Sequence, residues 1–326
     1  MTIADNPLSE VYDGVHLFVP PPDRIAGWRR SANVVLLEGE RALFLIDTGG
    51  PSVRKQLTVI VRDFIQDREY PVHCMHTHGH IDHMAGALSM KEVFGAGIWA
   101  HSDAIPFIEK QSPIFLERER ESLIVPFRDL FTAPSWFVIA AMRVALGRTR
   151  SLSSVGVIDD VPGFLSTGFR PVELPGHHHG HTGFFNDQSG ILIAGDLIDP
   201  RHRMKPILTS PSSNYQMMKE SLDSVQRLSP TMLIPGHGNP IKGEEEIQSA
   251  IEKSLLTLGQ ALEAVISILE DKACSLPDLA SRLTRMGLGP GDVFRRMFIH
   301  SILRHLIEMK RVSKQTGQRK VLFSLQ

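Results

Sequence analysis

The chain has 326 residues, of which 42% are hydrophobic and 22% charged, and its formal net charge at pH 7 is −1. This composition excludes a disordered chain, and the near-zero charge gives no sign of a polyanionic partner for the chain as a whole. Two cysteines far apart in sequence, a beginning without the apolar stretch of a signal peptide, and no apolar run of about 18 residues predict a cytoplasmic protein that does not enter a membrane.

The first part of the chain alternates between the hydrophobic patterns of strands and helices. We expect strands at 11–20, 33–37, 42–46, 72–75 and 97–100, and helices at 53–67 and 82–94. The turn residues Glu38-Gly39-Glu40-Arg41 predict that the second and third strands form a hairpin. Strands that alternate with helices indicate an α/β layered domain.

Residues of about 104–165 interrupt this alternation and read as a helical insertion. We expect helices at about 112–131 and 135–147, the second of which is apolar almost all round and must therefore be buried. The insertion either packs against the chain itself or a twin subunit in a homodimer, or forms a lid over an apolar pocket. The lid would be lined by Phe127, Phe131, Trp136 and Phe137.

Strands are expected again at 169–174, 184–185, 191–193 and 231–234, with a helix at 215–228. Histidine and aspartate follow the ends of these strands and of two earlier ones. The segments are Asp47-Thr48-Gly49-Gly50, His76 to His83, Pro175 to His181, Gly195-Asp196 and Gly236-His237-Gly238. Imidazole and carboxylate are zinc ligands at neutral pH. We therefore expect one edge of a sheet sandwich to gather them around metal.

These motifs, in this order over roughly residues 11–240, resemble those of the metallo-β-lactamase superfamily. The resemblance implies an αββα sandwich that holds two metal ions, zinc by default, with iron or manganese also suited to such ligands. It implies seven metal ligands: His78, His80 and His177 for the first ion, Asp82, His83 and His237 for the second, and Asp196 bridging both.

Two further residues are expected outside the ligand set. The resemblance implies that Asp47 supports the site from behind, the alternative being a residue that only caps a turn. His177 is preferred as a ligand because it follows Pro175-Gly176, and His181 is assigned a supporting place. His178, His179 and His181 are weaker ligand candidates, and the alternative for each is a place behind the ligands or facing substrate.

The same resemblance implies a hydrolase in which a hydroxide held between the ions attacks a small carbonyl substrate, a thioester, ester or lactone. Asp82 and Asp196 are the expected catalytic carboxylates, and Asp82 could also carry a proton to the leaving group. The apolar insertion favours an acyl or aromatic substrate. The run His177 to Thr182 is similar to the glyoxalase II version of the motif, although basic glutathione-binding elements are not seen.

Residues 244–326 read as a separate module after a catalytic domain of residues 1–243. A long helix from 244 to about 271, a segment around 275–283, a helix at about 291–310 and a hairpin around Gly317 resemble a winged-helix module. From Arg282 onward the chain has ten basic and two acidic residues. The alternative function is therefore a phosphodiesterase or endoribonuclease with a nucleic-acid partner. We prefer a module that packs beside the site or mediates dimerisation. A third class is a regulatory protein that keeps the metal site without turnover.

Overall fold

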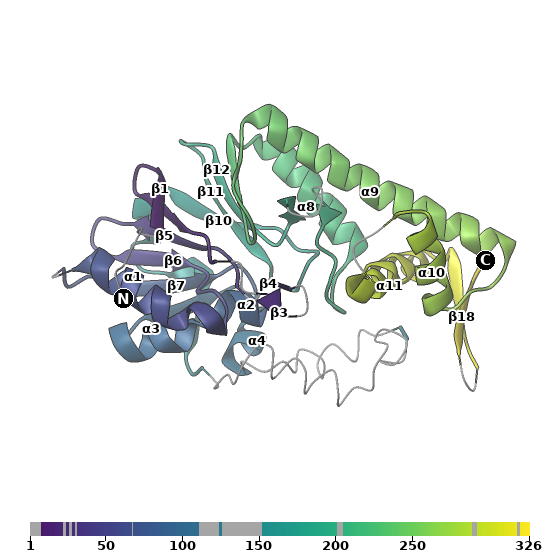
Figure 1. Ribbon diagram of the computed structural model, residues 1–326, viewed down its shortest axis with the longest axis horizontal. Helices are drawn as coiled ribbons and strands as arrows, with labels where there is room; N and C mark the ends of the chain where they lie inside the picture. Colours follow the sequence, from purple (N-terminus) through teal and green to yellow (C-terminus); the bar gives the residue numbers. More distant parts are fainter. Residues whose placement is uncertain are drawn as a thin grey trace.

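The computed structural model describes residues 8–21, 24–25, 28–29, 31–66, 68–110, 124–125, 152–200, 205–288, 292–317 and 320–326. Apart from residues 124 and 125, both helices expected in the insertion, with the four aromatic residues of the proposed lid, lie outside these residues. Two sheets form the centre of the molecule (Figure 1). The first has seven strands in the order β1 (Leu8–Tyr12), β2 (Val15–Phe18), β5 (Val34–Glu38), β6 (Leu43–Ile46), β7 (Val72–His76), β8 (Gly97–Ala100) and β9 (Val155–Val157).

The second sheet contains the strands of the later motifs. Its order is β10 (Phe169–Glu173), β11 (Thr182–Asn186), β12 (Ile191–Gly195), β15 (Met232–Pro235) and β16 (Ile241–Lys242). Strands β12 and β15 run parallel, as do β6 and β7 in the first sheet. Three small ladders complete the pairing in the described ranges: β3 (Arg24–Ile25) with β4 (Trp28–Arg29), β13 (Ile198–Asp199) with β14 (Lys205–Pro206), and β17 (Val312–Thr316) with β18 (Val321–Leu325).

The alternating side chains of β6 show why the sheets stack. Phe44 and Ile46 point toward the second sheet and pack with Phe184. Leu43 and Leu45 point to the opposite face, where α1 (Arg54–Ile65) and α3 (Ala87–Phe94) cover the sheet. Because both faces are buried, β6 is apolar at every position instead of every second one.

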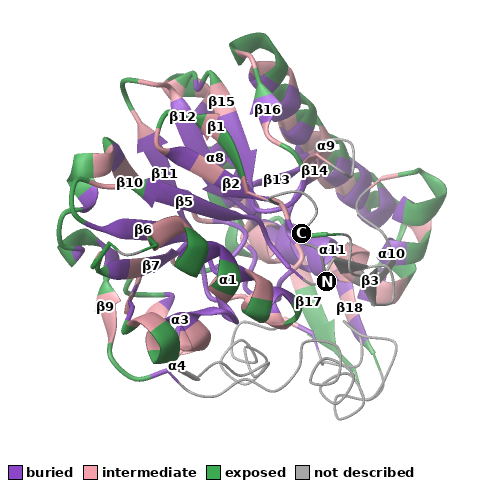
Figure 2. Ribbon diagram, turned by 60° about the vertical axis from the view of Figure 1, so that its left-hand side comes forward, coloured by how far each residue is buried: buried purple, intermediate pink, exposed green. Residues whose placement is uncertain are grey.

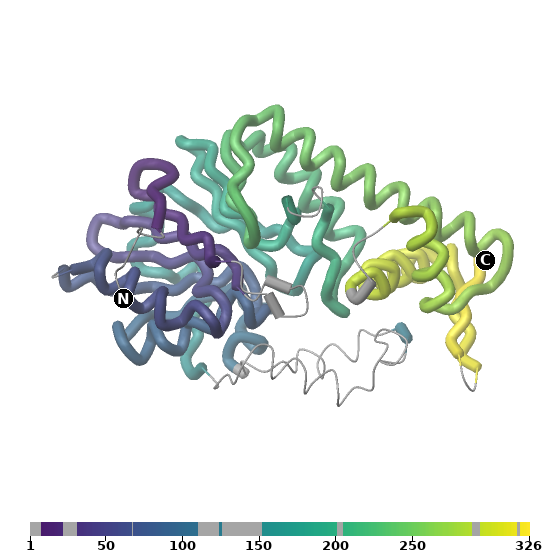
Figure 3. The backbone as a smooth tube through the Cα atoms, viewed as in Figure 1, coloured from purple at the N-terminus to yellow at the C-terminus, as the bar shows by residue number. Residues whose placement is uncertain are grey.

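The outer face of the second sheet is covered by α8 (Tyr215–Leu228) and α9 (Glu244–Asp271), which completes the four layers of an αββα sandwich. The same apolar cluster continues into α10 (Leu276–Arg285), α11 (Asp292–Glu308) and the β17–β18 hairpin. The backbone tube in Figure 3 follows α9 from the second sheet out to this C-terminal group. Cys274 and Phe323 exchange backbone hydrogen bonds of 3.0 and 2.9 Å, which attach the hairpin to the start of α10.

The helix–helix–helix–hairpin order expected after residue 243 is thus present. One apolar core runs through the predicted boundary at 243. In Figure 2, buried residues are coloured purple both in the second sheet and in the helices after it. Within the predicted insertion, the structure describes α4 (Ile105–Lys110), strand β9, and 3₁₀ turns at Ile158–Asp160 and Phe164–Thr167. None of the helices in the described ranges has the length and apolar character to cross a membrane.

Two element predictions were wrong, in each case at a glycine. Residues 11–20 form two strands, because Gly14 adopts a φ of +68° and turns the chain between β1 and β2. The helix expected at 82–94 is divided into α2 (Ile81–Met84) and α3. Gly86 lies at the division, where an added Cβ would stand 2.3 Å from the carbonyl oxygen of Thr48.

Candidate metal centre

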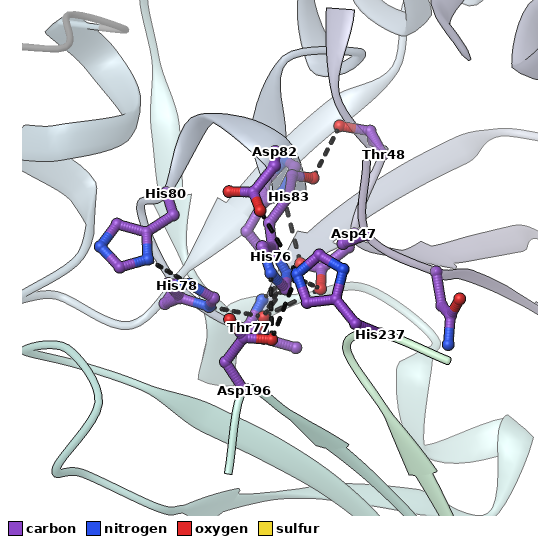
Figure 4. Close-up of polar contacts among 12 residues, drawn as sticks. Asp47, Thr48, His76, Thr77, His78, His80, Asp82, His83, Asp196 and His237 are labelled. Carbon is purple, nitrogen blue, oxygen red and sulfur yellow. Dashed lines mark hydrogen bonds and ion pairs between the residues drawn. The ribbon is translucent and has the colours of Figure 1, made fainter. Parts of the chain in front are cut away.

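The five motif segments meet at one end of the sandwich, because each follows or precedes a strand whose end lies there. Asp47 follows β6, and the histidine-rich segment follows its parallel neighbour β7. Asp196 and His237 follow the parallel pair β12 and β15. Figure 4 shows Asp196 and His237 reaching from the second sheet toward the residues of the first. Parallel strands thus place their carboxyl ends, and the side chains that follow, at one edge.

Three imidazoles form the first group of potential metal donors: His78, His80 and His177. Nδ1 of His80 lies 2.9 Å from Nε2 of His78 and 2.9 Å from Nε2 of His177. Nitrogen ligands 2.0–2.1 Å from one tetrahedral zinc ion would be about 3.3 Å apart, so a small outward shift would admit the ion. The structure therefore brings together the three residues expected for the first site.

The second group consists of Asp82, His83 and His237. Nε2 of His237 lies 3.3 Å from Oδ2 of Asp82. The helical turn of α2 places Asp82 and His83 side by side, while His237 comes from the opposite sheet. These are the three residues expected for the second site.

Asp196 lies between the two groups and directs one carboxylate oxygen to each. Its Oδ1 is 3.3 Å from Nε2 of His83 and 3.6 Å from Nε2 of His237. Its Oδ2 is 3.5 Å from Nε2 of His177. A carboxylate placed in this way can share its two oxygens between two cations and offset part of their repulsion.

Hydrogen bonds on the far side of two rings fix which nitrogen faces the centre. Nδ1–H of His177 donates to the carbonyl oxygen of Ile207 over 2.8 Å. Nδ1–H of His83 donates to Oδ2 of Asp47 over 2.7 Å. In both rings Nε2 therefore points inward, and such outer partners are what orient the histidine ligands of metals.

Asp47 is held in place by Thr77, a residue of the histidine-rich segment to which the sequence assigned no role. It adopts a φ of +61°, a backbone conformation that aspartate tolerates better than most residues. Its Oδ1 accepts the backbone N–H of Thr77 at 2.9 Å, and the Thr77 hydroxyl donates to Oδ2 at 2.9 Å. The Thr77 oxygen can then accept from Nδ1–H of His78, 3.0 Å away, which leaves Nε2 of His78 toward His80.

His181 lies outside the donor groups, where the sequence placed it. Its Nδ1–H donates to the carbonyl of Leu174 at 2.8 Å, and its Nε2 accepts the backbone N–H of Asp196 at 3.0 Å. Both ring nitrogens are therefore used, and the ring fixes the backbone of the bridging carboxylate. His178 is buried beside the first group, with its ring 4.5 Å from that of Phe107, while His179 is exposed.

The electrostatics of the centre suit cations. Burial lowers the pKa of His78 and of His80 well below the ordinary value, so that their lone pairs are free at neutral pH. Burial also opposes charge on His83 and Asp196. For His83, attraction to Asp196 and Asp47 outweighs burial and holds its pKa well above the usual range. For Asp196, attraction to His237 and His83 outweighs burial and holds its pKa well below the usual range.

Atoms that lack a hydrogen bond test whether these residues fit a metal. Nε2 of His83 and Oδ1 of Asp196 are buried and make no hydrogen bond, although they face each other as an ion pair at 3.3 Å. Buried polar atoms without a partner are rare and indicate a missing water or ion. A cation beside them would satisfy both atoms and displace the proton of His83. The donor set, three imidazoles on one side and an imidazole–carboxylate mixture on the other, suits zinc, iron or manganese.

The comparisons with known proteins agree with this geometry. The family model of the metallo-beta-lactamase superfamily matches residues 27–237, a span that contains all seven donor residues. The chain belongs to this superfamily. Metallo-beta-lactamase membership and the donor groups together support a metal-binding hydrolase.

Two curated relatives are informative. The chain is 30% identical over 283 residues to the probable metallo-hydrolase YqjP of Bacillus subtilis, covering 80% of this chain and 81% of that protein. It is 27% identical over 164 residues to the hydroxyacylglutathione hydrolase GloC of Haemophilus influenzae, covering 50% of this chain and 65% of that protein.

Solved structures extend the metallo-beta-lactamase likeness beyond the family match. A metallo-beta-lactamase family protein from Thermus thermophilus superposes with a TM-score of 0.72 at 20% identity, covering 97% of this chain and 100% of that one. A beta-lactamase domain protein from Burkholderia ambifaria gives a TM-score of 0.65 at 18% identity, covering 98% and 95%. The shared fold therefore reaches into the elements after residue 243.

Proposed function

We propose that this protein is a binuclear metal-dependent hydrolase that cleaves a small carbonyl substrate, a thioester, ester or lactone. The position of Asp196 carries the proposal, because its two oxygens face two separate donor groups at 3.3–3.6 Å. In this assignment His78, His80 and His177 hold one ion, and Asp82, His83 and His237 hold the other. Zinc is the first choice of metal, with iron or manganese as alternatives.

Bound in these positions, the two ions would activate a water as nucleophile and polarise the carbonyl oxygen of the substrate. The protein's own residues perform the remaining tasks. Asp196 offsets part of the positive charge inside the site, and both it and His83 are almost fully enclosed. The Asp82 side chain is 25% exposed, against 7% for Asp196, so it is the carboxylate of the two that is more open to solvent. This exposure supports Asp82 as the group that accepts a proton from the attacking water and passes it to the leaving group.

The substrate class is supported by one relative and one contact. GloC is by name a hydroxyacylglutathione hydrolase, and acylglutathiones are thioesters. Beside the first donor group, the partly exposed ring of Phe107 lies against His178, and its Cβ is 2.5 Å from where a Cβ on Gly79 would stand. An apolar ring next to the metals suits the acyl or aromatic part of a carbonyl substrate.

The C-terminal helices give little support to the alternative function of a phosphodiesterase or endoribonuclease. In a winged helix that reads nucleic acid, the third helix lies in a groove with one face free. Here residues 297–303 of α11 are all buried against neighbouring elements. Arg304, one of the basic residues behind this alternative, donates to backbone carbonyls within the protein.

A substrate panel tests the proposal. The zinc-loaded protein is assayed with a p-nitrophenyl ester, an acyl thioester and a lactone, against bis-p-nitrophenyl phosphate and single-stranded RNA. We expect carbonyl substrates to be preferred and Asp196→Ala to be inactive on all of them. Activity confined to RNA, falling steeply with added salt, would overturn the assignment. Turnover by Asp196→Ala at the wild-type rate would overturn the bridging role of this residue.

A further inference from the structure

The turn that presents His177 rests on a segment supplied by residues 207–214. The Ile207 carbonyl accepts from Nδ1–H of His177 at 2.8 Å, and the Ser213 hydroxyl donates to the His177 carbonyl at 2.8 Å. The backbone N–H of Asn214 donates to the Gly176 carbonyl at 2.8 Å. Orientation of this imidazole therefore depends on where the 207–214 segment lies.

This segment is in turn held by α11, which belongs to the C-terminal group of elements. Nη2 of Arg304 donates to the carbonyl oxygens of Ser212, at 3.3 Å, and of Ser213. The Arg304 side chain is only 12% exposed, and its neighbour His305 packs its ring 4.9 Å from that of Tyr215, the first residue of α8. Hydrogen bonds from a guanidinium to carbonyls are about twice as strong as neutral ones.

We propose that Arg304 is a positioning residue for the metal centre: it holds the Ile207–Asn214 segment so that Nε2 of His177 faces the first donor group. The proposal rests on the proposed function for the role of His177 as a ligand. It gives α11 a task in the active site, although the helix lies outside residues 27–237 that match the family. Loss of Arg304 should affect the first donor group and not the second, because the segment that Arg304 holds lies behind His177, a residue of the first group.

Metal affinity tests the proposal in site-selective backgrounds. Zinc binding is measured by chelator competition in His237→Ala, which lacks a donor of the second group, and in His80→Ala, which lacks a donor of the first. Arg304→Met, which keeps the stem of the side chain, is then added to each background. It should weaken zinc binding by about tenfold in His237→Ala, where the first donor group is intact, and change the affinity of His80→Ala by no more than about twofold. Arg304→Lys should restore part of the loss. Arg311→Met removes the same charge from an exposed position of the same group and is the matched control.

A second measurement needs neither metal nor turnover. In the metal-free protein with ¹⁵N-labelled histidine, nuclear magnetic resonance reports which ring nitrogen of His177 carries the proton. We expect a fixed Nδ1–H in the wild type and in Arg311→Met, and a mixture of both tautomers in Arg304→Met. The peak is assigned by its loss in His177→Gln.

The outcomes separate this proposal from the proposed function. If Arg304→Met changes neither the tautomer of His177 nor the zinc affinities, the positioning role is overturned. It is also overturned if Arg304→Met lowers the melting temperature and weakens zinc binding equally in the two backgrounds. If the wild type binds no metal but the tautomer shifts as described, the hydrolase proposal fails and the positioning of the ring by Arg304 stands.

Discussion

Asp47 shows how one side chain outside the donor groups can control the centre. Its carboxylate accepts from His83 and twice from Thr77, so it fixes the inward direction of one ring and the start of the histidine-rich segment. We predict that Asp47→Ala lowers metal affinity and turnover by about 10–100-fold, the usual cost of losing such an outer partner. Asp47→Asn keeps the left-handed backbone and one acceptor oxygen and should lose less.

Chelator competition and steady-state kinetics of both variants measure this. An Asp47→Ala protein with wild-type metal affinity would show that the residue only caps the turn, the alternative that the sequence left open.

His300 is a second residue whose environment makes a measurable prediction. It is fully buried in α11, and its Nε2 accepts the backbone N–H of Ile124 at 3.1 Å. Burial lowers the pKa of His300 to about 3, whereas in the unfolded chain it keeps the ordinary value of about 6.5. As pH falls from about 6.5 toward 3, the unfolded state takes up this proton first. Stability is therefore present above pH 6.5 and is lost as the solution becomes more acidic.

We expect His300→Gln to flatten the loss of unfolding free energy between pH 6.5 and 4, by at most about 1.4 kcal/mol per pH unit. Urea unfolding at several pH values, compared with the wild type, isolates this histidine from the others. The same pH slope in both proteins would contradict a buried neutral His300.

At the scale of elements, Gly86 explains why one expected helix became two. Its missing side chain lets the turn after α2 pack against Thr48, the neighbour of Asp47. Gly86→Ala should therefore destabilise the protein by about 1–3 kcal/mol through overpacking. Gly259 is the matched control, because it lies within α9 with no atom within 4 Å of an added Cβ. Gly259→Ala should stabilise by roughly 0.5–1 kcal/mol. Thermal unfolding that ranks the two variants the other way would contradict this account of the break.

The elements that the sequence predicted well are those whose pattern is strong and local. The helix at 215–228 was predicted with its observed bounds, because its apolar stripe begins after the Asn214 cap. Gly14 and Gly86 were missed because a lone glycine in an apolar run is compatible with either continuation or a turn. Which of the two occurs is decided by distant partners, such as Thr48 for Gly86.

The donor residues could be proposed from the sequence because their motifs are short and specific in side-chain type. The groups that hold these donor residues in place could not be proposed from the sequence. The carbonyl of Ile207 holds His177, and any residue could offer that carbonyl. Arg304 is 127 positions from His177 and reads in sequence as one of many basic residues near the C-terminus. Contacts through backbone atoms or over long sequence separations leave no local pattern to read.

At the scale of the whole molecule, the two sheets, the donor groups and the C-terminal elements depend on one another. The segment after β7 of the first sheet supplies Asp82 and His83, and the ends of β12 and β15 in the second sheet are followed by Asp196 and His237. The site therefore exists only where the two sheets meet (Figure 4). The apolar cluster on the outer face of the second sheet extends into α9, α10 and α11 without interruption. Residues after 243 therefore help to hold the half of the site that carries Asp196.

The most direct test of the central claim is anomalous diffraction from zinc-loaded crystals, recorded on both sides of the zinc absorption edge. We predict two peaks about 3.5–4 Å apart, one within about 2.0–2.1 Å of Nε2 of His78, Nδ1 of His80 and Nε2 of His177. The other should lie among Asp82, His83 and His237, with Asp196 between the two. No peak at this edge of the sandwich, or a single peak bound by residues other than these seven, would contradict the account.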